Sequence, residues 1–178
     1  HGIPHLHQFN PDDTTLQLTV TDSITGETVH IQHYHATCAH KTLGVFLNPD
    51  LSSDAEYSHL RAKAQSLYTR LLPKQLSGEI IRRFLMTMCR PSLCYGTPLS
   101  SLTKNQWHQV QNQLLTLVLS KLHFNKSTPA ALRHAPIRTG GLALPDGYAE
   151  QGAQHITLLL KHLRAETTVG EHFKVMLS

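Results

Sequence analysis

Apolar residues recur at helical spacing over most of this chain, and that repeat limits the fold more than any other feature. Ser53 and Glu56 have the spacing of a capping box, which predicts a helix that starts after Ser53. Pro73 should end this helix, because its ring clashes with the preceding turn. The stripe expected on its buried side consists of Tyr57, Leu60, Ala64, Leu67, Tyr68 and Leu71.

The same spacing predicts two more helices in the middle of the chain. The second should start at Ser77, with Pro91 and a break at 96–98 after it. The third should start at Thr103, where Gln106 completes another capping box. The side chains expected inside are Ile80, Ile81, Phe84, Leu85 and Met88 in the second helix and Trp107, Val110, Leu114, Leu117 and Val118 in the third.

A fourth helix is expected from about Asp146 to Arg164, after the break at Gly140-Gly141. A loop with a short helix should cover Asn125 to Pro136, and a ragged tail should follow the fourth helix. The residues predicted to face inward on the fourth helix are Tyr148, Gly152, Ile156, Leu159, Leu160 and Leu163.

The N-terminal part of the chain has the alternating pattern of β-strands. Residues 16–20 and 29–31 alternate apolar with polar side chains, and turn-forming residues separate them, so we predict a β-hairpin. A third short strand is expected over Thr42–Leu47. The predicted fold class is therefore α+β and mainly α, with short N-terminal strands followed by a helical bundle.

Charge is distributed unevenly along the chain. Residues 1–60 hold one basic and seven acidic residues, whereas residues 61–138 hold twelve basic residues and one acidic residue, Glu79. Lys63 and Arg70 are seven residues apart, as are Arg83 and Arg90, so each pair should share one flank of its helix. Such a basic block indicates a polyanionic partner, with nucleic acid the usual one, or else a solvated helical surface.

Length and composition exclude several classes of protein. With 178 residues and 40% hydrophobic residues, the chain is long and apolar enough for one folded domain. It has no apolar run long enough to cross a membrane and no visible secretory signal. Its lack of an initiating Met indicates a fragment, a processed product or an incomplete reading frame. Three cysteines without a CxxC pair favour a reducing compartment, so we expect an intracellular protein of the cytoplasm or nucleus.

Metal or catalytic chemistry has only weak candidates. Asp12-Asp13 is interpreted as a surface turn rather than a metal-binding pair, because no strand pattern flanks it. The stretch 30–40 contains metal-ligand residue types, with His33 and His35 on one side of a strand, but lacks a second cluster for tetrahedral zinc. A copper site at His1 would resemble secreted polysaccharide monooxygenases, whose β-sandwich does not fit the helical stripes. Whether the chain is part of an enzyme stays uncertain on these residues alone.

Several segments resemble reverse transcriptases of the non-LTR retrotransposon type. Residues 41–47, KTLGVFL, are similar to the family's K-x-L-G-V/I motif, and residues 10–16, NPDDTTL, look like the segment before the last palm hairpin. Residues 91–96, PSLCYG, resemble a mid-thumb motif, and residues 140–145, GGLALP, resemble G-G-L-G-L-P with Ala143 in place of Gly. Residues 148–152 and 158–164 look like the closing helix of such domains. Order and spacing over about 150 residues make the match fairly specific.

The resemblance implies the C-terminal part of an RNA-directed DNA polymerase. Residues 1–50 would be the end of the palm with a primer-gripping hairpin, 51–166 a helical thumb, and 167–178 a C-terminal tail. The carboxylates that bind Mg²⁺ in the parent polymerase would lie outside this chain, as would the remaining palm and fingers. The alternatives are a non-catalytic helical interaction module and a decayed retroelement remnant without activity.

The resemblance also implies how the chain would contact nucleic acid. A thumb positions the primer–template duplex, and cations on helix flanks can lie against phosphate rows without reading sequence. Gly44 would let the hairpin backbone approach the primer end, unless it serves only a bulge or tight strand packing. The predicted nucleic-acid-binding residues are Lys41, Gly44, Lys63, Arg70, Arg82, Arg83 and Arg90.

Overall fold

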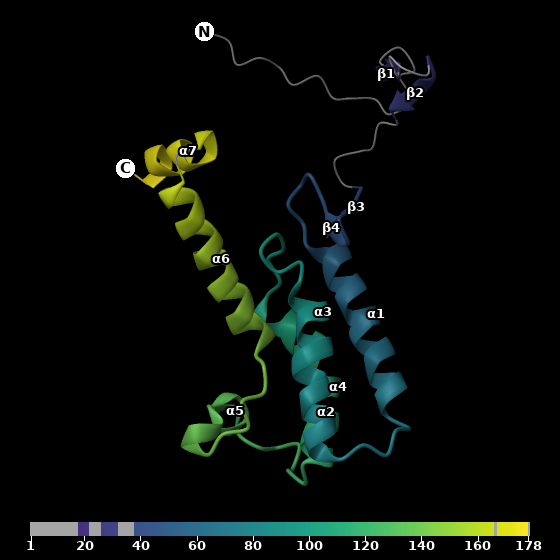
Figure 1. Cartoon of the computed structure of the whole chain (residues 1–178), viewed down its shortest axis with the longest axis vertical. Coiled ribbons are helices and arrows are strands. Elements are labelled where there is room, and N and C mark those ends of the chain that lie inside the picture. The colour runs from purple at the N-terminus through teal and green to yellow at the C-terminus, as the bar shows by residue number, and fades with distance from the viewer. Residues whose placement is uncertain (1–17, 22–25, 32–37, 166, 178) are drawn as a thin grey trace.

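The computed structural model describes residues 18–21, 26–31, 38–165 and 167–177. These residues are mainly helical, with two short antiparallel hairpins that precede the helices in sequence (Figure 1). The predicted α+β, mainly α class is therefore confirmed. Asp12-Asp13, His33, His35 and the segment 10–16 lie outside the described residues.

The first hairpin joins β1 (Leu18–Thr21) to β2 (Thr28–Ile31). The strands are antiparallel, with Leu18 opposite Ile31 and Thr21 opposite Thr28. The alternating residues predicted this hairpin, and its existence is confirmed. In Figure 1 it stands apart from the helices.

The second hairpin replaces the single strand expected over Thr42–Leu47, and that prediction is wrong. β3 (His40–Thr42) and β4 (Val45–Leu47) pair around a two-residue turn. Leu43 has a φ of 50° and Gly44 a φ of 90°, the pair of positive values that a two-residue turn of this handedness requires. A continuous strand cannot contain two such residues, so the chain reverses here.

α1 (Asp54–Leu71) follows the second hairpin, and its first turn is attached to it by a buried carboxylate. Glu56 accepts a hydrogen bond of 2.8 Å from the backbone N–H of Phe46. Ser53 does not cap the helix with its side chain; its hydroxyl accepts a hydrogen bond from the N–H of Ser101. The predicted capping box is therefore wrong, because both of its side chains bind backbone from other segments instead.

α4 (Lys104–Lys121) is the central helix of the bundle, and α1 packs along it. The capping box of Thr103 and Gln106 is present, as predicted, and Pro73 follows α1 as expected. The predicted stripes of both helices form the core, which confirms them. The fully buried members are Leu60, Ala64 and Leu71 in α1 and Trp107, Val110, Leu114, Leu117 and Val118 in α4.

Between α1 and α4 the chain forms one continuous helical run with a π-turn inside it. α2 (Gly78–Phe84) continues through the π-helical segment η2 (Leu85–Cys89) into α3 (Arg90–Cys94). A π-turn holds one more residue than an α-turn, so it rotates the residues after it about the helix axis. Cys89 is therefore fully buried and Met88 is 58% exposed.

Three predictions for the second helix are corrected by this run. Met88 does not face inward, and Ile80 is also exposed. Pro91 does not follow the end of the helix but lies in the first turn of α3, where proline is tolerated. The π-turn also separates Arg83 from Arg90, so the two no longer follow each other along one unbroken α-helical flank.

The segment between α4 and the last long helix folds back on itself. α5 (Ala130–His134) is the short helix that was predicted, and the 3-10 turn η3 (Ile137–Thr139) ends at Gly140 with a φ of 81°. Gly141 then passes so close to Ala135 that any side chain would collide with its backbone. The double glycine therefore marks a real reversal of the chain, after which Leu144 enters the core.

α6 (Gly147–Arg164) has the predicted limits but the opposite orientation. The residues expected inside lie outward: Ile156 is 61% exposed, and Tyr148, Leu159 and Leu160 are also exposed. α6 instead contacts α3 and α4 through its first turns. The tail expected over 167–178 contains a helix, α7 (Thr168–Leu177), at the far end of α6 (Figure 1).

A buried glutamine accounts for this orientation of α6. Gln151 is 5% exposed, and its Oε1 accepts hydrogen bonds from Trp107 Nε1 at 2.8 Å and from the N–H of Leu102 at 3.1 Å. Its Nε2 donates to the carbonyl of Leu102 at 3.0 Å. Gly147, one turn earlier, lies against the Trp107 ring, where a Cβ would overlap the ring. Polar groups of α6 are thereby satisfied inside the protein, and its apolar side is left outside.

Replacement of Gln151 by Met should destabilise the fold. Met has a similar volume but leaves the indole N–H and both backbone groups of Leu102 without partners, at a cost of about 2–4 kcal/mol. Urea unfolding followed by circular dichroism measures the free energy of unfolding. The matched control is Gln113→Met on the exposed side of α4, which should change it by less than about 0.5 kcal/mol. Equal effects of the two substitutions would contradict this role of Gln151.

Candidate nucleic-acid interface

Most cations of the basic block lack an acidic partner in the part of the chain that the structure describes. Of its twelve Lys and Arg residues, only Arg82, Arg83 and Arg90 lie within salt-bridge distance of a described carboxylate. The other nine make no such ion pair with the described residues. They are Arg61, Lys63, Arg70, Lys74, Lys104, Lys121, Lys126, Arg133 and Arg138.

Lys63 and Arg70 share one flank of α1, as predicted, but only Arg70 is exposed. The Nζ of Lys63 donates a hydrogen bond of 2.7 Å to the carbonyl of Ser92 in α3. Lys63 therefore helps to hold α1 against α3. Arg70, two turns further along the helix, keeps its guanidinium available to solvent.

Arg61 lies on the other side of α1, beside a groove between α1 and α4. The groove has a volume of about 500 Å³ and is polar. Tyr57 donates a hydrogen bond across it to Gln109 Oε1. Gln65 and Gln113 add further amide groups along its length. The cations of α1 are thus divided between two flanks, and the groove was missed at the sequence level because glutamines carry no motif.

Arg82 and Arg83 in α2 share a single counter-ion, Glu79. The N–O distances are 3.8 Å for Arg82 and 3.6 Å for Arg83, both long for an ion pair. The Arg83 side chain is 75% exposed, so this contact is weak and easily replaced. The Arg82 Nε is buried and has no hydrogen-bond partner among the described residues. Arg83 is the cation of the pair that a ligand in solution can reach.

Arg90 is committed to an internal ion pair. Its Nη2 lies 2.7 Å and 2.9 Å from the two carboxylate oxygens of Glu150 in α6. This hydrogen bond raises the pKa of Arg90, despite an opposing effect of burial. The pair lies in a hollow of about 320 Å³ that Tyr95 and Gln154 also line. Arg90 therefore fastens α3 to α6, a role that the predicted list of binding residues did not include.

The two predicted residues of the second hairpin are exposed at its surface. Lys41 places its Nζ 5.6 Å from the centre of the Phe46 ring, a cation–π contact. Gly44 has a φ of 90°, a backbone conformation that favours glycine. Space does not require glycine, because a Cβ there would meet no other atom within 4 Å. The turn alone explains Gly44, and its contact with a primer end stays a prediction.

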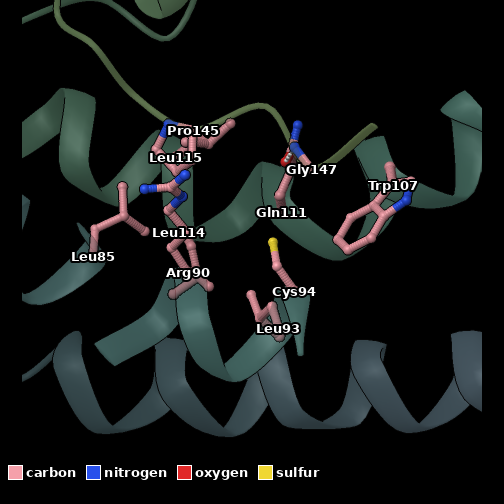
Figure 2. A pocket seen from close by; sticks show the side chains of 10 residues that line it. All are labelled: Leu85, Arg90, Leu93, Cys94, Trp107, Gln111, Leu114, Leu115, Pro145 and Gly147. Carbon is pink, nitrogen blue, oxygen red and sulfur yellow. Dashed lines mark hydrogen bonds between the residues drawn. The ribbon is translucent and has the colours of Figure 1, made fainter. Parts of the chain in front are cut away.

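The small cavity in the core cannot hold an organic ligand. It lies where η2, α3, α4 and the start of α6 meet, and its volume is about 20 Å³ (Figure 2). Leu85, Leu114 and Leu115 line it, and Gln111 closes one side by accepting a hydrogen bond of 2.9 Å from the N–H of Gly147. Binding pockets for small molecules measure roughly 300–1,000 Å³, so this space is a packing gap.

Within the described ranges, the structure contains no group of three side chains that could hold a metal ion. No helix among the described residues combines the length and the apolar character needed to cross a bilayer. Comparison of the chain with protein-family models, with curated proteins and with solved structures found no match.

Arg90 and Arg83 should differ sharply in their effect on stability. Arg90→Gln removes a two-oxygen ion pair that is partly shielded from solvent, and we expect a loss of about 1 kcal/mol in the free energy of unfolding. Arg83→Gln should change it by less than about 0.5 kcal/mol. Chemical denaturation of both variants provides the measurement. A loss at Arg83 as large as that at Arg90 would contradict the division into internal and free cations.

The three cysteines should differ in reactivity. All are free, with Cys38 exposed and Cys89 and Cys94 buried. Burial raises the pKa of both Cys89 and Cys94 to about 11, so these thiols stay neutral and unreactive when folded. Titration with a thiol reagent at pH 8 should label Cys38 rapidly and the other two only after unfolding. The same two thiols should make the free energy of unfolding fall as the pH rises from 9 to 11. In that range the unfolded chain loses their protons, whereas the folded chain keeps them.

Proposed function

We propose that this chain is the C-terminal palm and thumb part of a non-LTR-type reverse transcriptase, and that it positions a primer–template duplex. The observation that carries the proposal is the basic block of residues 61–138, most of whose cations have no acidic partner among the described residues. Unneutralised Lys and Arg on a folded surface attract phosphates whatever the base sequence. The order of the family-like segments supports the same assignment.

Arg70 and Arg83 are the cations best placed for this task, because both are exposed and neither holds the bundle together. Arg61 adds a third cation beside the polar groove, where glutamine amides can donate to sugar and phosphate oxygens. Lys63 and Arg90 contribute by fixing α1, α3 and α6 in place. In this proposal binding is electrostatic and insensitive to sequence.

The chain's own role is positioning rather than chemistry. Magnesium ions in the parent polymerase would activate the primer 3′-hydroxyl, and their carboxylate ligands would lie outside this chain. The free thiols are consistent with a reducing compartment, so the proposed location is intracellular, in the cytoplasm or nucleus.

Binding should show the salt dependence of phosphate contacts. If about five phosphates are neutralised, the logarithm of the affinity for a fluorescent RNA–DNA hybrid should fall with the logarithm of salt with a slope near −4. The double variant Arg70→Gln/Arg83→Gln should make the slope shallower by about 2. Glutamine is preferred to glutamate at residue 83 because Glu79 lies one turn away.

The charge-matched control is Lys161→Gln/Lys174→Gln, which removes two cations outside the basic block and should leave the slope unchanged. Binding that does not respond to salt, or equal losses in both double variants, would remove the proposal. Circular dichroism of each variant shows whether the helices are intact.

A non-catalytic interaction module is the second candidate, and the exposed apolar side of α6 favours it. In that case the full chain would show no affinity for the hybrid, whether or not it associates through this side. The salt titration distinguishes the two functions directly.

A further inference from the structure

α6 presents a continuous apolar surface that is mostly exposed, although α7 packs near its C-terminal end. Each residue along a helix is rotated by about 100°, so positions three or four apart share one face. The face opposite Gln151 carries no charged side chain over four turns. We name this the α6 face; it consists of Tyr148, Ala149, Gly152, Ala153, Ile156, Leu159, Leu160 and Leu163, of which all but the half-buried Leu163 are exposed.

After Tyr148 at its start, the α6 face has small residues in its N-terminal half and large residues in its C-terminal half. Ala149, Gly152 and Ala153 occupy its N-terminal half, and Gly152 has no atom within 4 Å of where a Cβ would lie. Leucines occupy its C-terminal half, and Ile156 lies at the middle. A helix that runs in the opposite direction with the same sequence would place each leucine over a small residue, which is how closely packed helix pairs fit.

The charges at the two ends of α6 have opposite signs. Asp146 caps the N-terminus of the helix, and Arg164 lies in its last turn. In an antiparallel pair centred on Ile156, Arg164 of one copy lies beside Tyr148 of the other, within one turn of Asp146. The helix dipoles also oppose each other in this arrangement, which is favourable.

From these two kinds of complementarity, we infer that the α6 face is the interface of a homodimer, in which two copies of α6 pack antiparallel about a twofold axis at Ile156. The pairs across the axis are 152 with 160, 153 with 159, and 149 with 163. Such an interface is isologous, so it closes at two copies. The inference does not rest on the proposed function, because the basic block of residues 61–138 ends before α6 begins.

Sedimentation equilibrium of the full chain at tens of micromolar should give twice the mass of one chain. Ile156→Glu places two carboxylates together at the axis and should reduce the mass to that of a monomer, with an unchanged helical circular dichroism spectrum. Thr157→Glu is the matched control, because it adds the same charge one residue away, outside the α6 face, and should leave the dimer intact.

Disulfide trapping tests the position of the axis without adding a charge. In a Cys38→Ser background, which removes the exposed thiol, Ile156→Cys should form a disulfide-linked dimer under mild oxidation, whereas Thr157→Cys should not. A monomeric full chain, an assembly larger than two, a dimer that survives Ile156→Glu, or equal trapping at both positions would overturn the inference.

Discussion

The buried amide of Gln151 is the interaction on which the helical arrangement depends. It binds both backbone groups of Leu102 and the indole N–H of Trp107, and thus ties α6 to the start of α4. These hydrogen bonds stabilise the fold. Without the amide, the indole N–H and the backbone groups of Leu102 would be buried without partners, which costs free energy. The Arg90–Glu150 pair and the contact of Gly147 with Trp107 secure the same junction. This junction also decides which side of α6 faces solvent.

The cations of the basic block fall into two groups, those that hold helices together and those that face solvent. Arg90 and Lys63 bind groups of the protein itself, so their charges are used in holding helices together. Arg70 and Arg83 are exposed, and their charges extend into solvent. Sequence spacing treats these residues alike, because it shows the flank of a helix but not the element that packs against that flank.

Local signals predicted the limits of α1, α4 and α6 well, and non-local contacts decided the rest. Thr103 and Gln106 cap α4 through neighbouring atoms, so their spacing was sufficient. Ser53 and Glu56 have the same spacing, but backbone groups from elsewhere in the chain bind them instead. The sequence pattern did not predict the π-turn, which depends on one extra residue in a turn. It also did not predict the orientation of α6, which depends on the contacts of Gln151. Of the candidate site, the exposure of Arg70 and Arg83 was predictable, and the commitment of Arg90 to Glu150 was not.

Glu56 has a mechanical consequence for the second hairpin. Its carboxylate binds the N–H of Phe46 in β4, and Gly96 of the bundle lies so close that a Cβ there would be 2.9 Å from Val45 and 3.0 Å from Glu56. The base of the hairpin is therefore clamped between α1 and the end of α3. The hairpin is thereby fixed to α1, so the direction of that helix sets where the tip formed by Leu43 and Gly44 lies.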